Sequence, residues 1–171
     1  MDFIQKVRIN KNLKTSCQSL LQTTTFYSSI ETLNGIDDKV YNQIVQLCEE
    51  GDILFEVEQF DQALEKYLVA LDMVPAPKTD WEASTWLYTV IGDTYLIKDD
   101  YEMAKSNFYN ALNCPDGISN PLILLRLGES LFECGGLEKA KEYLLKAYML
   151  EGYKIFFEED DKYFDLIKDI I

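Results

Sequence analysis

The chain contains no histidine among its 171 residues. Histidine is the commonest protein ligand of zinc, and it is the usual base beside a catalytic serine or cysteine. Without histidine, neither a Ser-His-Asp nor a Cys-His site can be assembled. We therefore expect no catalytic residues, no metal and no cofactor, and we predict that the protein is not an enzyme.

Long apolar runs are also missing. Nowhere do 18 apolar residues occur together, and the first residues, MDFIQKVRINKN, contain no apolar run that could serve as a signal segment. The four cysteines are far apart and form no C-x-x-C pair, so they are expected to be small core residues. These features predict a cytoplasmic protein in a reducing compartment.

Basic residues are too few to balance the acids. Thirty acids against sixteen bases give a formal charge of -14, and the whole excess lies in residues 39–171. Such a surface repels nucleic acid and anionic lipid and attracts basic proteins over a Debye length of about 10 Å. We expect a protein partner with a basic surface, no nucleic acid and no membrane. The alternative is that the acidity only keeps the protein soluble.

An internal repeat is present in the middle of the chain. In three segments a glycine is followed twelve residues later by an alanine, and a second alanine comes seven residues after the first. A large apolar residue lies four positions beyond the first alanine. The glycines are Gly51, Gly92 and Gly128, the alanines are Ala63/Ala70, Ala104/Ala111 and Ala140/Ala147, and the large residues are Tyr67, Phe108 and Leu144. Each segment reads as two amphipathic helices, with the glycine of the first helix facing an alanine of the second.

This pattern resembles the tetratricopeptide repeat, whose signature is the same set of small and large positions. The resemblance implies an all-α fold of three tandem helix-turn-helix pairs in a right-handed superhelical stack, with flanking N- and C-terminal helices. The chain departs from the family in its glycine-to-glycine steps, which are 41 and 36 residues. Extra residues in the connecting loops account for the difference.

The repeat divides the chain into three parts. An N-terminal helical segment (1–38) precedes the repeats (39–152), and a C-terminal capping helix (153–171) follows them. The repeats span about residues 41–75, 82–116 and 121–152, with helix pairs near 39–57/60–73, 80–98/101–113 and 121–134/137–151.

If the geometry of the family holds, the first helix of each pair lines a concave wall. On that wall we expect acids interleaved with large apolar groups, which would suit a basic, partly apolar segment of a partner. The expected partner-binding residues are Asp52, Phe55, Glu56, Trp86, Asp93, Leu96, Glu129, Phe132 and Glu133. The alternative is that the aromatic residues pack against flanking helices and the acids only face solvent. Residues 156–164 are the next candidate site.

The resemblance also argues against one kind of ligand. Family members that clamp the acidic tails of heat-shock chaperones present lysines and asparagines on this wall. The corresponding positions here are Cys48, Asp52, Val90, Leu122 and Arg126, which include a single cation. A clamp for a carboxylate tail is therefore not expected.

The tail YMLEGYKIFFEEDDKYFDLIK resembles the end of small bacterial tetratricopeptide proteins, several of which are immunity proteins that neutralise secreted polymorphic toxins. This resemblance implies a toxin domain as the partner, and an acidic protein suits a basic toxin. Three such repeats at this length also resemble type III secretion chaperones, which implies a secreted client. A generic scaffold subunit is the third interpretation, and a second copy of the chain, giving a homodimer, is a further candidate partner.

Overall fold

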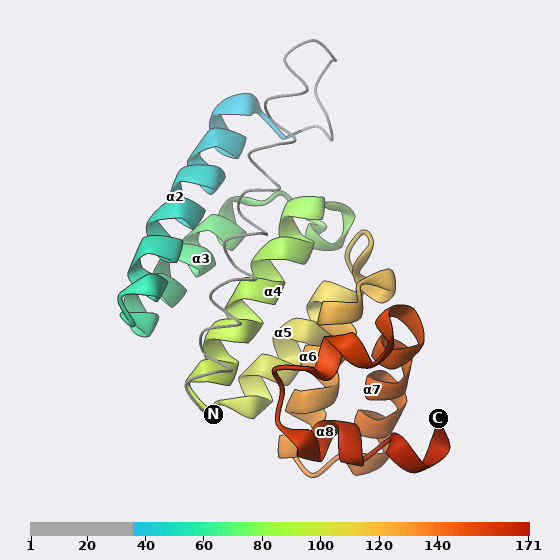
Figure 1. The fold of residues 1–171 in the computed structure, drawn as a ribbon. Coiled ribbons are helices and arrows are strands. Elements are labelled where there is room, and N and C mark those ends of the chain that lie inside the picture. Colours follow the sequence, from blue (N-terminus) through green and yellow to red (C-terminus); the bar gives the residue numbers. More distant parts are fainter. Residues whose placement is uncertain (1–35) are drawn as a thin grey trace.

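The fold is described from a computed structural model, which places residues 36–171 (Figure 1). Within this range the regular structure is α-helix and short 3₁₀ helix, and these residues contain no strand. The all-helical prediction is therefore confirmed for the described residues. The helix expected near the N-terminus lies outside them.

Six helices form three successive pairs (Figure 1). Within each pair the two helices pack along each other, α2 with α3, α4 with α5 and α6 with α7, while α3 also packs on α4 and α5 on α6. The observed bounds differ from the predicted ones by no more than two residues. They are α2 Asp38–Glu56, α3 Phe60–Met73, α4 Glu82–Ile97, α5 Tyr101–Leu112, α6 Pro121–Glu133 and α7 Leu137–Glu151.

The turn inside each pair has the same backbone design. Seven residues after each glycine of the repeat, one residue adopts positive φ: Glu58 at 60°, Asp99 at 58° and Gly135 at 77°. This left-handed conformation is strained for a residue with a side chain and free of strain for glycine. Only the third turn has glycine at this position. The positive φ therefore recurs because the three helix pairs have the same backbone geometry, and not because they have the same residue there.

Each glycine of the repeat packs closely against a large residue of the second helix. A Cβ atom on Gly51, Gly92 or Gly128 would lie 2.5, 2.8 or 2.7 Å from the side chain of Tyr67, Phe108 or Leu144, respectively. The nearest atoms to each glycine on the second helix thus belong to the large residue four positions beyond the first alanine. The need for glycine is steric, because a fully buried ring or leucine fills the space that a side chain on the first helix would need.

Residues 153–171 were expected to form one capping helix, and this expectation is wrong. We call residues 152–171 the C-terminal segment. The segment contains three short pieces, Gly152–Phe156, α8 Asp161–Asp165 and Lys168–Ile170. Gly152 has φ 70° and ψ -166°, which ends α7, and the Asp160 side chain caps α8 by accepting a hydrogen bond from the Lys162 backbone N–H. The segment still lies against α6 and α7, as its position in Figure 1 shows, and buries Tyr163 and Ile167 there.

Candidate functional site

The nine residues of the expected wall do not form one exposed surface. Asp93 and Glu129 are only 2% exposed, so neither lies on an accessible wall, and the alternative that the acids only face solvent is also wrong for these two. Of the other seven residues, Phe55, Trp86 and Leu96 are buried, Asp52, Phe132 and Glu133 are half-buried, and Glu56 is exposed. The wall is therefore largely closed by other parts of the molecule.

Arg126 explains the burial of the two acids. Its side chain is 1% exposed and lies among three carboxylates from three parts of the chain. Nη1 donates to Glu129 Oε2 at 2.7 Å and to Glu159 Oε2 at 3.0 Å, and Nε lies 3.5 Å from Asp93 Oδ1. Asp93 belongs to α4, Arg126 and Glu129 belong to α6, and Glu159 belongs to the C-terminal segment. We call these four residues the buried charge cluster.

One guanidinium group cannot neutralise three buried carboxylates. Burial and the nearby Glu159 raise the pKa of Asp93 to about 7, although Arg126 acts in the opposite direction. For the same reasons the pKa of Glu129 is raised to about 8. Burial opposes the charge on Arg126, but the three carboxylates outweigh it and hold its pKa above the ordinary value. At neutral pH the cluster therefore holds protons that exposed carboxylates would have lost.

The cluster also bears on the acidic-tail clamp. The only cation expected on the wall is Arg126, and it is already surrounded by acids within the molecule. An incoming carboxylate would have to displace one of them and join a net negative site. The buried cluster thus agrees with the argument against a clamp.

Two further residues of the expected wall contact the C-terminal segment. The hydroxyl of Tyr163 donates to Glu133 Oε1 at 2.7 Å, and Lys162 Nζ lies 2.8 Å from the same oxygen. The Phe132 and Tyr163 rings meet edge to face with their centroids 5.4 Å apart. Phe132 and Glu133 therefore help to hold the segment in place.

The aromatic residues of the expected wall in the first two pairs, Phe55 and Trp86, pack inside the fold. Phe55 is buried and meets the Phe60 ring at a centroid distance of 5.2 Å. Trp86 is buried and meets Tyr67 at 6.3 Å. These rings build the core between α2, α3 and α4. They are not available to a partner without a rearrangement of that core.

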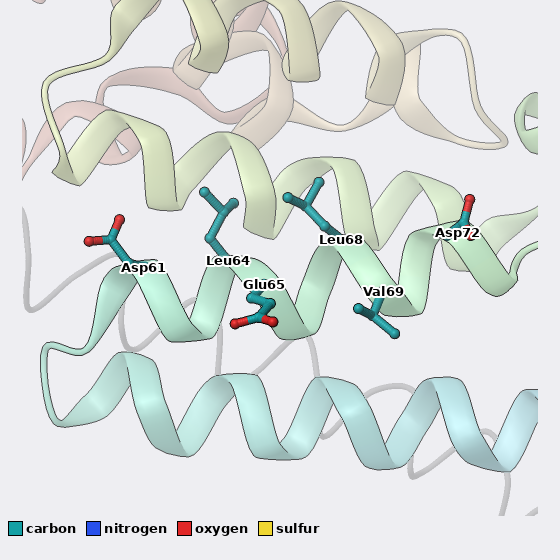
Figure 2. A pocket seen from close by; sticks show the side chains of 6 residues that line it. All are labelled: Asp61, Leu64, Glu65, Leu68, Val69 and Asp72. Carbon is teal, nitrogen blue, oxygen red and sulfur yellow. The ribbon is translucent and has the colours of Figure 1, made fainter.

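A shallow depression of about 420 Å³ lies on the outer side of α3 (Figure 2). All of its lining residues belong to this helix. Leu64 and Leu68 point to one side of the helix axis, while Glu65 and Val69 point to the other. Asp61 lies at one end of the depression and is paired with Lys98. The depression offers a small apolar surface with acids around it.

A second exposed apolar surface lies where α7 meets the C-terminal segment. Met149, Leu150, Tyr153 and Phe157 are 75%, 53%, 47% and 69% exposed. We call these four residues the C-terminal patch. Only its last residue falls in the sequence range 156–164 that was the secondary candidate. The signal for the rest was present in YMLEGYKIFF, which holds more large apolar residues than one buried face can take.

Chemical sites are not evident among residues 36–171. In this range no three cysteine or acidic side chains are grouped so that they could hold a metal ion. Cys48 and Cys114 are buried, and Cys134 is half-buried. No helix of the described part is long and apolar enough to cross a membrane.

Comparison with models of known protein families gave no match, and comparison with curated proteins gave none either.

Proposed function

We propose that this protein is a binding module of the tetratricopeptide type whose partner is a basic, folded protein. The helix pairs support the family assignment through two repeated details. In each pair a glycine packs against the large residue sixteen positions later, and a left-handed residue turns the chain seven positions after that glycine. Such stacks offer extended surfaces for protein binding.

The observation that carries the proposal is the exposed surface itself, which combines acids with large apolar side chains. The second helices of the pairs present exposed acids to solvent, and the exposed apolar groups lie among them. The acids are Asp61, Glu65, Asp72, Glu102, Glu138 and Glu142, and the apolar groups are Leu68, Val69, Met103, Leu137, Met149 and Leu150. Acids of this kind speed the approach of a basic partner, and apolar groups slow its release.

Within this class, the role that we propose is that of an immunity protein which neutralises a secreted toxin. An immunity protein must cover a folded toxin domain quickly and tightly, and an acidic surface suits a basic one. The closed wall favours this role over a secretion chaperone. A chaperone would need an open groove for an extended client segment, whereas the wall here is largely buried. A scaffold subunit is the remaining alternative.

The test uses the protein encoded by the gene next to the one for this chain. We expect that protein to be basic, to stop growth when it is expressed alone, and to be harmless when this chain is expressed with it. Isothermal titration calorimetry on the two purified proteins is expected to give tight binding that weakens as salt is added. Binding without any protection of growth would favour the scaffold role, and no binding would refute the proposal for that pair.

A further inference from the structure

We propose that the C-terminal patch is the surface that docks this basic partner, and that the partner inserts it into an apolar pocket rimmed by lysine or arginine. The inference rests on the proposed function and locates its site. The patch consists of Met149 and Leu150 at the end of α7, with Tyr153 and Phe157 from the segment that follows.

The exposure of the patch is unusual for its residue types. Phe157 is 69% exposed and Met149 is 75% exposed, although each could bury a large apolar area in a complex. Phenylalanine, tyrosine and methionine are enriched where proteins meet, whereas scattered exposed leucines are common on any surface. Three such side chains within nine residues, Met149, Tyr153 and Phe157, therefore indicate an interface, and Leu150 adds to it.

The two aromatic side chains of the patch, Tyr153 and Phe157, are restricted by ring contacts. Tyr153 meets Phe157 at a centroid distance of 5.2 Å and Phe164 at 4.6 Å, and Phe164 in turn lies 5.5 Å from Phe156, which is buried. A partner would therefore meet side chains whose positions are already restricted. This lowers the entropy cost of binding, which is one property of residues that dominate interfaces.

The buried charge cluster also holds the segment that carries Phe157 against α6. Glu159 follows Phe157 by two positions and accepts a hydrogen bond from Arg126 at 3.0 Å. Further along, the Tyr163 hydroxyl donates to Glu133. The turn that carries Phe157 is thus fixed to α6. Its neighbours Phe156 and Glu159 are buried, and Phe157 is left on the surface.

Charges around the patch select the partner. Glu158, Asp160 and Asp161 come within four positions of Phe157 and are exposed. The two lysines nearby are already paired with acids, Lys154 with Glu151 and Lys162 with Glu133 and Asp160. A rim of this sign attracts a basic protein and repels a second copy of this chain, whose formal charge is -14. The occupant is therefore a basic partner and not a homodimer mate.

The depression on α3 is the competing surface. Leu68 and Val69 are 43% and 47% exposed, and the residues that line the depression all come from one helix and include no aromatic residue. One of its acids, Asp61, is already paired with Lys98. The C-terminal patch has more exposed apolar surface and an aromatic centre, so we place the docking there. The depression then serves as the matched control.

The first part of the experiment finds the contact. Phe157, and separately Leu68, is replaced by a photoreactive phenylalanine analogue in the full chain, which is irradiated in its own cells. We expect a basic protein, identified by mass spectrometry, to cross-link at position 157 and not at position 68. A cross-link at 157 to a second copy of the chain, or to an acidic protein, would overturn the proposal.

The second part measures the affinity of the identified protein, purified, for two double variants. Met149→Ala with Phe157→Ala removes two side chains of the patch, and Leu68→Ala with Val69→Ala removes two of the depression. We expect about a 30-fold loss of affinity for the first and less than about threefold for the second. Circular dichroism checks that both variants stay folded.

The outcomes separate the site from the function. If the α3 variant loses affinity and the patch variant does not, the patch is refuted while the binding function stands. If neither variant loses affinity, the patch is refuted as well. If no protein cross-links at either position and the product of the neighbouring gene does not bind, both the proposed function and the patch fail.

Discussion

Replacing Asp93 by asparagine is expected to make the protein more stable at alkaline pH, although the change removes one member of an ion pair. Asp93 is buried beside Arg126, but Arg126 also faces Glu129 and Glu159. The carboxylate of Asp93 is a poorly compensated charge of the cluster, because Arg126 donates hydrogen bonds to Glu129 and Glu159 but only lies 3.5 Å from Asp93 Oδ1, which has no hydrogen-bond partner. Asparagine has nearly the same shape and carries no charge.

The size of the effect follows from the raised pKa. In the folded protein the pKa of Asp93 is about 7, compared with an ordinary value of 3.8. Stability from this group is complete below the ordinary value and is lost as the pH rises through the folded value. Between about pH 5.5 and about pH 8.5, the loss from Asp93 integrates to about 2 kcal/mol. The asparagine variant is expected to keep that stability.

Urea unfolding followed by circular dichroism, at both ends of this pH range, measures the difference. The variant and the natural protein are expected to be similar at the acidic end, where Asp93 is protonated, and to separate at the alkaline end. Asp72→Asn, at an exposed position on α3, is the control and is expected to leave the pH dependence unchanged. An equal loss of stability at both pH values in the Asp93 variant would refute the reasoning, because Asp93 would then act as a well-paired charge.

Three further changes test the packing and the anchors. Gly92→Ala is expected to cost about 1–3 kcal/mol in thermal unfolding, because its Cβ would lie 2.8 Å from the Phe108 ring; an unchanged melting temperature would contradict this contact. Arg126→Met leaves the buried carboxylates without a cation and is expected to cost about 3–5 kcal/mol at alkaline pH and less at acidic pH, as urea unfolding will measure; a loss that did not depend on pH would argue against the cluster. Tyr163→Phe removes the hydrogen bond to Glu133 and is expected to cost about 1–2 kcal/mol. In that variant, faster proteolysis of the C-terminal segment is the readout, and unchanged cleavage would speak against its anchoring role.

Much of the helical layout could be predicted from the sequence, because local signals determine it. The spacing of small and large residues repeats three times, and each turn lies where the pattern places it. Glu58, Asp99 and Gly135 lie in the gaps between the two predicted helices of each pair, and all three have positive φ. Such features depend on neighbours within a few positions along the chain, which a periodic pattern records directly.

The candidate wall could not be predicted in the same way. Helical periodicity shows which residues share a face, but it does not show what covers that face. Here Glu159, Lys162 and Tyr163 cover part of the wall from a segment that was expected to be one helix and instead folds as three short pieces. One local signal was available, since Arg126 lies inside the apolar run LILLRLG. A lone arginine in such a run indicates a buried cation, and a buried cation requires acids beside it.

The buried charge cluster changes how cooperatively the molecule is expected to open. In a linear array of helix pairs each pair contacts only its neighbours, and local openings can begin at either end. Arg126 instead joins α4, α6 and the C-terminal segment through one side chain, so that separating any of them leaves a buried charge without its partner. We therefore expect the helices from α4 to α7 to open together. Their most protected backbone amides should then exchange hydrogen with similar free energies of opening. Removal of the residues from Glu159 onward would loosen α4, although more than sixty positions separate the two in the chain.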